Sequence, residues 1–193
     1  MTEIILASQS PYRKELLSRL KIPFKTHSPH LDEHSFYKPE NTPLEIAKTL
    51  SFEKAKKVQS SYPEAIIIGS DQVLSFEKEI FGKPNDIQVA ISQLKRMRGK
   101  NHRLITAVSV LYKNKIDSFH EITSLRLRED LLDREIIDYV KKDLPLDCAG
   151  SYKIEGLGIS LFQEILTSDF TAIIGLPLIK LAGILRQYHF QIP

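Results

Sequence analysis

Short apolar runs alternate with stretches of helical periodicity along the chain. Ile4 to Ala7 and Ala65 to Gly69 are continuous apolar runs of strand length, which is typical of strands buried on both faces. Ser10 and Pro11 follow the first run and supply an N-cap and a first-turn proline, after which leucines recur at helical spacing. The opening therefore predicts a strand, a loop and the N-terminus of a helix.

Four further helices are predicted from apolar spacing and capping residues. Thr42-Pro43-Leu44-Glu45 has the capping-box pattern, with proline at the first helical position. The expected helices cover residues 43 to about 62, residues 87–97 with Asn85 or Asp86 as the cap, a segment through Ile136 and Val140 that ends before Pro145, and Pro177 through Leu185.

The remaining apolar runs are rich in β-branched residues and predict strands. Leu104 to Leu111, Ile116 to Phe119 and Ile122 to Leu127 fit an antiparallel meander with a turn at Lys113-Asn114, and Ala172 to Ile174 fits a further strand. This mixture predicts an α/β fold with an elongated mixed β-sheet, flanking helices and two lobes around a central cleft.

Composition is that of an ordinary globular protein. The 193 residues include 42% hydrophobic and 26% charged residues, and neither a repeat nor a Gly/Ser-rich or Pro-rich linker divides them, so we expect a single domain over residues 1–193. A formal net charge of +3 is too small for the field of a dedicated nucleic-acid binder. A polyanionic small substrate is compatible with it.

The apolar runs are also too short for a membrane span or for the core of a signal peptide. A single cysteine, Cys148, cannot form an internal disulfide, which fits a reducing compartment. We therefore expect a cytoplasmic protein without a membrane partner. Cys148 has no signature of a nucleophile and is interpreted as a small buried side chain.

Residues 8–14 combine two hydroxyls with a basic pair at a predicted helix N-terminus. Free N–H groups and the helix dipole favour anions there, and Ser8, Ser10 and Arg13 would complete a cradle for phosphate oxygens. The alternative is that Ser10 is only a cap and that Arg13 and Lys14 are solvated.

Asp32 and Glu33 are adjacent carboxylates in a predicted loop, with His30 and His34 on either side. Pro29 and the absence of a convincing third ligand argue against zinc. A magnesium ion is a better match for a carboxylate, because Mg²⁺ takes oxygen ligands and keeps waters and substrate phosphates. The alternative is an acidic surface loop.

Gly69-Ser70-Asp71-Gln72 ends the second apolar run, which predicts that Asp71 lies at the mouth of the sheet. A carboxylate there would hold a metal or accept a proton from water, whereas the alternative is a turn cap. Lys83, in Gly82-Lys83-Pro84, and one lysine among Lys54, Lys56 and Lys57 are candidates to face a triphosphate.

Taken together, eight motifs in this order and spacing resemble the Maf-like nucleotide pyrophosphatases. They are Ser8-Gln9-Ser10-Pro11-Tyr12-Arg13, Asp32-Glu33, Glu53-Lys54-Ala55, Gly69-Ser70-Asp71-Gln72-Val73, Gly82-Lys83-Pro84, His102 with Thr106-Ala107, Ala149-Gly150-Ser151-Tyr152 and Gly175-Leu176-Pro177-Leu178. The resemblance implies a Maf/Ham1 (ITPase-like) fold, a divalent cation, and hydrolysis of a nucleoside triphosphate with release of pyrophosphate. The catalytic aspartate of the family falls on Asp71.

Tyr12, Gln72 and Glu155 look like the branch of the family that acts on 7-methyl-GTP. By this resemblance they match positions that set base choice. An aromatic face at Tyr12 would attract the cationic N7-methylated ring, and Glu155 would accept hydrogen bonds from the guanine edge.

The resulting hypothesis assigns a role to each candidate. Mg²⁺ or Mn²⁺ is held by Asp71 and Glu33, a water attacks the α-phosphorus, and Asp71 is catalytic as proton acceptor, ligand or both. The substrate-binding residues are Ser8, Ser10, Arg13, Lys54 and Lys83. Alternatives are a dTTP or UTP pyrophosphatase and a non-catalytic nucleotide- or nucleic-acid-binding regulator of septum formation. The oligomeric state stays open, and homodimers are common in the family.

Overall fold

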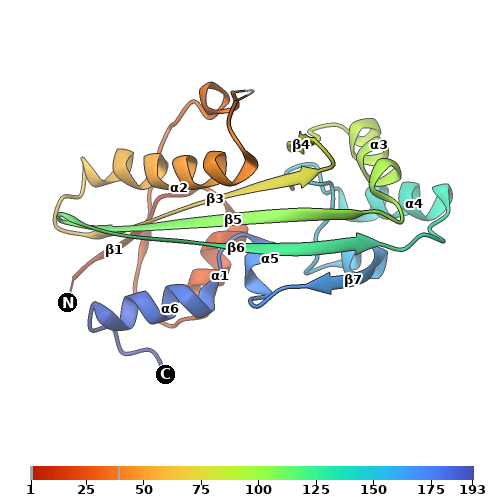
Figure 1. Cartoon of the computed structure of the whole chain (residues 1–193). Coiled ribbons are helices and arrows are strands. Elements are labelled where there is room, and N and C mark those ends of the chain that lie inside the picture. Colours follow the sequence, from red (N-terminus) through yellow and green to blue (C-terminus); the bar gives the residue numbers. More distant parts are fainter. Residues whose placement is uncertain (1, 39) are drawn as a thin grey trace. The chain divides into compact units, whose positions relative to one another are not determined.

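The computed structural model describes residues 2–38 and 40–193. Helices and strands alternate over most of the chain (Figure 1). In chain order the elements are β1 (Ile4–Leu6), α1 (Pro11–Ser18), β2 (Lys25–Thr26), the 3-10 helix η1 (His34–Phe36), α2 (Pro43–Gln59), β3 (Ile66–Phe76), β4 (Glu79–Phe81), α3 (Ile87–Met97), β5 (Asn101–Tyr112), β6 (Lys115–Leu127), α4 (Asp133–Asp143), the 3-10 helix η2 (Leu157–Leu161), β7 (Phe162–Leu166), α5 (Thr171–Ile174) and α6 (Leu178–Gln187).

The strands form one mixed sheet. Its order is β2-β1-β3-β5-β6-β7, and β4 pairs with β3 off this path. β1 pairs in parallel with β2 and β3, whereas the β3–β4 and β6–β7 pairs are antiparallel. The predicted α/β class with a long mixed sheet and flanking helices is therefore confirmed.

Contacts divide the chain into two compact units. The first comprises residues 1–72, 106–121 and 169–193, and the second comprises residues 73–105 and 122–168. β3, β5 and β6 each contribute residues to both units. A single domain over residues 1–193 and two lobes around a cleft both stay predictions.

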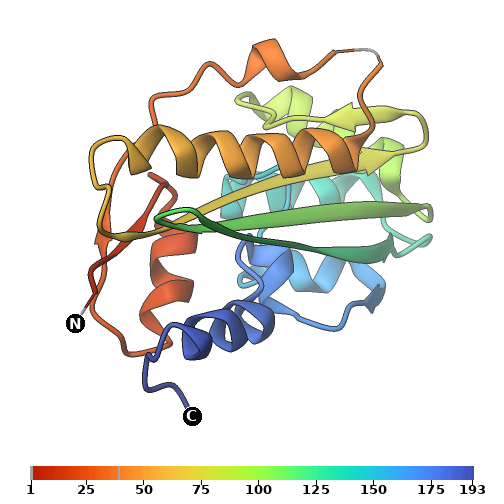
Figure 2. The same ribbon diagram turned by 60° about the vertical axis from the view of Figure 1, so that its left-hand side comes forward.

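In the first unit, strand alternation assigns side chains to two helical layers. Ile66 and Ile68 of β3 join the cluster that includes Leu16 and Leu17 of α1 and several leucines of α6. Their neighbour Ile67 belongs to a second cluster, which Ala55 and Val58 of α2 complete. Helix α2 accordingly covers one face of these strands, and α1 and α6 cover the other (Figures 1 and 2). Period-2 alternation in β3 thus decides which helix each of its residues meets.

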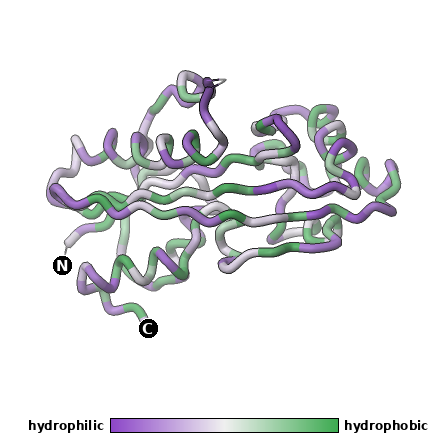
Figure 3. Tube along the Cα trace, in the orientation of Figure 1, coloured by the Kyte–Doolittle hydropathy of each residue, from purple (hydrophilic) through white to green (hydrophobic). Residues whose placement is uncertain are grey.

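Helix α2 is amphipathic and begins at the predicted capping box. Thr42 Oγ1 accepts a hydrogen bond from Glu45 N at 3.3 Å, and Glu45 Oε2 accepts one from Thr42 N at 2.8 Å. Hydrophobic and hydrophilic positions alternate along its turns (Figure 3). Its buried positions recur every three or four residues, and Lys54 is one of them. Helical spacing therefore turns this lysine toward the sheet.

The second unit contains α3, α4 and parts of β3, β5 and β6. Helices α3 and α4 bury one apolar face each, and Asp86 caps α3 through the N–H groups of Gln88 and Val89. His102, Tyr152 and Phe162 form an aromatic cluster whose ring centroids lie 4.9–6.2 Å apart. This unit therefore has a core of its own.

Three strand predictions were wrong. β3 does not end at Gly69 but continues to Phe76, so Asp71 lies inside a strand. Ile116 to Phe119 and Ile122 to Leu127 form one strand, β6, which the two-residue turn Lys113-Asn114 joins to β5 as predicted. Ala172 to Ile174 lies in the short helix α5, because the preceding Asp169 accepts a hydrogen bond from Thr171 N and favours helix initiation.

Candidate active site

The site in the first unit begins with the alternation of β3. Gly69 faces α2, where a Cβ would collide with Ser51 O and Ala55. Asp71, two residues on, faces the same way and contacts Lys54 of α2. Ser70 and Gln72 point to the opposite side, where they contact the α5 segment. The parallel β1–β3 pairing ends at Leu6 and Ile68, so the loop after β1 and Asp71 both follow the carboxyl end of that pair.

A buried lysine joins two carboxylates. Lys54 Nζ lies 2.6 Å from Asp71 Oδ1 and 2.8 Å from Glu33 Oε1. Lys54 is 5% exposed and Asp71 4%, whereas the side chain of Glu33 is 44% exposed. Asp71 Oδ2 is buried and has no hydrogen-bond partner among the described residues. An acceptor oxygen without a partner at such a site is suited to a ligand.

Burial and the neighbouring positive charges shift the pKa of Asp71 in opposite directions. Burial raises the pKa of the Asp71 carboxyl, and the positive charges of Lys54 and Arg13 counteract that rise. Burial lowers the pKa of the Arg13 guanidinium, and the negative charges of Asp71 and Glu33 partly counteract this decrease. Burial and the same two carboxylates raise the pKa of the Tyr37 phenol. Arg13 and Tyr37 therefore belong to the electrostatic neighbourhood of Asp71.

Ser8 and Ser10 of the predicted cradle lie in the loop between β1 and α1. Ser8 is buried and its Oγ accepts a hydrogen bond from Ser10 N at 3.1 Å. Ser10 caps α1 by accepting from Arg13 N at 3.4 Å. Capping and anion binding are compatible, because the other N–H groups of the first turn still point out of the helix.

The side chain of Arg13 is held by a backbone carbonyl from the far end of the sequence. Its Nε donates to Gly175 O at 3.0 Å, and Ser70 Oγ donates to the same oxygen at 2.9 Å. A Cβ on Gly175 would lie 3.3 Å from Arg13 Nε, and its φ of 121° also favours glycine. This contact uses Nε and leaves the terminal nitrogens of the guanidinium for a ligand.

Gln72 is anchored to the same segment. Its Nε2 lies 3.0 Å from Thr106 Oγ1, 2.9 Å from Ala172 O and 2.9 Å from Ile173 O. Thr106 Oγ1 also donates to Ala172 O at 2.8 Å. The amide nitrogen thus fixes backbone, and only the amide oxygen remains to contact a ligand. Tyr12, on α1, is partly buried.

Lys83 and Glu155 belong to the second unit, where both are exposed. The structure thus brings Lys54, Asp71, Glu33 and Arg13 together in the first unit, next to the cradle of Ser8 and Ser10. The roles of Lys83 and Glu155 stay predictions.

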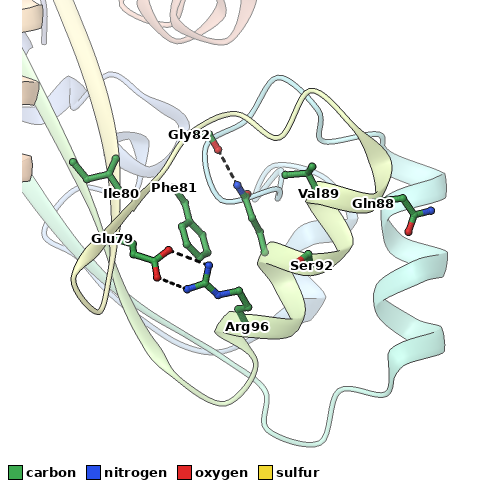
Figure 4. A pocket seen from close by; sticks show the side chains of 9 residues that line it. Glu79, Ile80, Phe81, Gly82, Gln88, Val89, Ser92 and Arg96 are labelled. Carbon is green, nitrogen blue, oxygen red and sulfur yellow. Dashed lines mark hydrogen bonds and ion pairs between the residues drawn. The ribbon is translucent and has the colours of Figure 1, made fainter. Parts of the chain in front are cut away.

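A pocket of about 430 Å³ also lies in the second unit, between β4 and α3. Arg96 pairs with Glu79 through two hydrogen bonds of 2.7 and 3.0 Å and lies over the Phe81 ring (Figure 4). Gln93 Nε2 donates a hydrogen bond to the Gly82 carbonyl at 3.2 Å. The two charged residues that line this pocket, Arg96 and Glu79, are paired with each other, so the pocket lining carries no net charge.

The donors in the first unit suit a hard divalent cation. Asp71 and Glu33 supply carboxylate oxygens, and the unpartnered Oδ2 of Asp71 is an available ligand atom. Within residues 2–38 and 40–193, no cluster of three or more His, Cys, Asp or Glu side chains is present. Two carboxylates with substrate phosphates and waters are the usual environment of Mg²⁺. The residues therefore fit a cation bound jointly by protein and substrate.

Several residues of the site had no assigned role in the sequence. Ser70, Thr106 and Gly175 lie in recognised motifs, but nothing local shows that they bind one another. Tyr37 is in a loop without a motif. Asp169 precedes Thr171 by two residues, a spacing typical of a local cap and the available signal for its role.

Two other predictions concern exposure. Cys148 is partly exposed rather than buried, which corrects its interpretation as a small buried side chain. Among the described residues, none of the helices has the length and apolar character needed to cross a bilayer. A cytoplasmic location stays a prediction.

The fold and site define an α/β protein with a serine-containing helix N-terminus and a buried carboxylate–lysine pair. Residues 3–188 match the family described as Maf-like protein. The chain belongs to the Maf family.

Similar proteins match over nearly their whole length. The chain is 44% identical over 197 residues to a protein of Xanthomonas campestris pv. campestris named 7-methyl-GTP pyrophosphatase, with 100% of both chains covered. Proteins of the same name from Aromatoleum aromaticum and Bdellovibrio bacteriovorus are 43% and 44% identical, with 100% and 96% of this chain and 98% and 96% of theirs covered.

Among solved structures, the chain is similar to two Ham1 proteins. The structure from Coxiella burnetii has a TM-score of 0.47 and 13% identity and covers 97% of this chain and 100% of its own. The structure from Staphylococcus aureus has a TM-score of 0.47 and 12% identity, with 66% and 73% covered.

Proposed function

We propose that this protein is a nucleoside triphosphate pyrophosphatase that hydrolyses 7-methyl-GTP to the monophosphate and pyrophosphate. The observation that carries the proposal is the buried Asp71 carboxylate, with Lys54 Nζ at 2.6 Å and an oxygen atom left without a partner. Relatives named 7-methyl-GTP pyrophosphatase at 43–44% identity support both the reaction and the base.

The chemistry is a hydrolysis at the α-phosphorus. The oxygen of a water forms a bond to phosphorus, and the bond from phosphorus to the α–β bridging oxygen breaks. Asp71 accepts the proton of that water, for which a raised pKa is favourable. The electron pair of the broken bond leaves with pyrophosphate, whose charge Arg13 and Lys54 stabilise.

Mg²⁺ or Mn²⁺ held by Asp71 and Glu33 would supply further charge neutralisation at the phosphates. Ser8, Ser10 and the first turn of α1 orient phosphate oxygens. Lys83 completes the set of substrate-binding residues by resemblance. Tyr12, Gln72 and Glu155 are assigned to the choice of base.

The first experiment measures pyrophosphate release from 7-methyl-GTP, GTP, dTTP and UTP with Mg²⁺. We expect the highest kcat/KM for 7-methyl-GTP. A preference for dTTP or UTP would overturn the base assignment and keep the reaction. No release from any of the four nucleotides would refute the enzymatic proposal in favour of a binding protein.

Asp71→Asn tests the catalytic assignment. We expect pyrophosphate release to fall by about 10²- to 10⁴-fold, the usual contribution of a general base. Lys54 keeps Glu33 as a partner at 2.8 Å, so the variant is expected to fold. Asp32→Asn is the matched control, because Asp32 is exposed and its Oδ1 accepts a hydrogen bond from His34 N in its own loop. A folded Asp71→Asn protein with full activity would remove Asp71 from the mechanism.

A further inference from the structure

The Gly175 carbonyl that holds Arg13 lies in a segment with little regular structure of its own. Residues 171–177 contain the four-residue helix α5, a glycine and a proline before α6 begins at Leu178. Gly175 N donates to Thr171 O at 3.2 Å and to Ala172 O at 3.1 Å, which ends α5. Something outside these local contacts must fix the carbonyl, because short helices are weak elements in isolation.

Asp169 supplies that fixation. The residue is 4% exposed, and its Oδ1 accepts hydrogen bonds from Thr171 N at 2.9 Å and from Thr171 Oγ1 at 2.6 Å. Oδ2 accepts from Ile179 N at 2.8 Å, in the first turn of α6. One carboxylate therefore ties the start of α5 to the start of α6.

Thr171 adds a second connection across the same segment. Its Oγ1 donates to Asp169 and accepts from Leu178 N at 2.8 Å. The chain between Thr171 and Leu178 is thus closed into a loop, and Gly175 lies inside it. A hydrogen-bond network whose polar groups are satisfied holds its members in one geometry.

The same loop is held from the sheet. Gln72 and Thr106 bind the carbonyl of Ala172, and Ser70 binds that of Gly175. These contacts fix the loop to β3 and β5, and Asp169 fixes its internal shape. Arg13 Nε donates a hydrogen bond to Gly175 O, so the position of this loop determines where the Arg13 side chain is held.

From this chain of contacts we propose that Asp169 is a positioning residue for Arg13 and, through it, for the triphosphate. The proposal rests on the function proposed above. The side-chain contacts of Asp169 described above are with Thr171 and Ile179. Asp169 acts through Thr171 and the Gly175 carbonyl, so its effect requires Arg13.

The test is a double-mutant cycle between Asp169→Asn and Arg13→Ala. Asparagine keeps the size of the side chain but replaces one acceptor oxygen with a donor that faces N–H groups. We expect kcat/KM for 7-methyl-GTP to fall by about 10- to 100-fold in the Arg13 background, as for a misplaced positioning group. In the Arg13→Ala background the same change has no further effect.

Calorimetric binding of inorganic tripolyphosphate supplies a readout that needs no turnover. We expect Asp169→Asn to weaken binding about 10-fold when Arg13 is present and not when it is absent, since the two residues are coupled. Equal losses in both backgrounds, no loss, or no binding by the wild-type protein would each overturn the proposal. If the wild type releases no pyrophosphate but the binding cycle holds, the proposed function fails and the positioning role stands.

Thr171 keeps the proposal testable if Asp169→Asn does not fold. Thr171→Val removes the hydroxyl at nearly constant volume, whereas Thr171→Ser retains it. We expect Thr171→Val to reproduce the Arg13-dependent loss and Thr171→Ser to restore it. Two variants that behave alike would argue that only packing matters and would refute the relay.

Discussion

The side-chain amide nitrogen of Gln72 is occupied by hydrogen bonds within the protein. Nε2 meets three oxygen atoms from Thr106, Ala172 and Ile173 at 2.9–3.0 Å. The sequence predicted a role in base choice, and the structure adds a role in holding the α5 segment. Such a role was invisible in the sequence because the partners lie 34, 100 and 101 positions away.

Gln72→Glu is therefore expected to damage the site for every base. A carboxylate would face the carbonyl oxygens of the buried residues Ala172 and Ile173 without a hydrogen to donate, which costs about 1–3 kcal/mol of unfolding free energy. We expect urea unfolding to show that loss and kcat/KM to fall for all four nucleotides. Gln72→Met, which introduces no charge, is the control. A Gln72→Glu variant whose only change is in the ratio between bases would contradict this role.

His102 titrates far below the usual range of a histidine. Its side chain is buried in the second unit with Nε2 3.1 Å from Tyr152 Oη, and burial lowers its pKa from 6.5 to about 4. Between these values the unfolded chain binds the proton and the folded chain does not. Stability therefore falls as pH drops from about 6.5 to about 4.

The size of this effect follows from the shift. A difference of about 2.5 pKa units corresponds to about 3 kcal/mol. Urea unfolding of the wild type and of His102→Gln at pH 7 and pH 4 isolates it from the carboxylates that titrate in both proteins. We expect the wild type to lose about 3 kcal/mol more than the variant. Parallel pH dependence in the two proteins would show that His102 is not the group responsible.

Among the elements, helices were the most predictable. Ser10, Thr42 and Asp86 are caps whose signal lies within three residues of the helix they begin, and each was found in the structure. Strand ends were less predictable, because β3 continues past Gly69 through polar residues that the neighbouring elements satisfy. The apolar run that suggested a strand at Ala172 is instead buried in a helix.

The contact between α2 and β3 depends on Gly69. An added Cβ would collide with the Ser51 carbonyl and with Ala55, both part of the helix that carries Lys54. We expect Gly69→Ala to destabilise the protein by about 1–3 kcal/mol, as for other overpacked cores, and to reduce activity because Lys54 moves with α2.

Gly82→Ala is the matched control for that substitution. No heavy atom lies within 4 Å of its added Cβ. Urea unfolding should therefore place Gly82→Ala near the wild type and Gly69→Ala well below it. If the two variants were equally stable, the helix would have room to move and the close packing at Gly69 would not constrain Lys54.

For the whole molecule, the family pattern predicted more than any local pattern did. Its motifs are spread over both units, and the structure brings those of the first unit to one carboxylate. Composition argued against a dedicated nucleic-acid binder but did not identify any residue of the site. The geometry that sequence could not provide is the set of long-range backbone contacts at residues 171–179, since backbone atoms leave no signature in the side-chain sequence.

The divalent cation is expected to affect the activity of the whole molecule but not its stability. In the folded chain, Lys54 lies within 2.6 and 2.8 Å of Asp71 and Glu33, and Arg13 adds a second positive charge near both, so the chain itself balances the two carboxylates. We expect EDTA to abolish pyrophosphate release, Mg²⁺ or Mn²⁺ to restore it, and the Tm to stay within about 2 °C, because little folding free energy depends on the cation.

In the Lys54→Met variant, we expect the stability of the fold to depend on the cation. With two carboxylates left close together, added Mn²⁺ should raise the Tm of the variant more than that of the wild type, as measured by calorimetry. A wild-type chain that unfolds when EDTA is added would show instead that the cation is structural and that Lys54 does not balance the site.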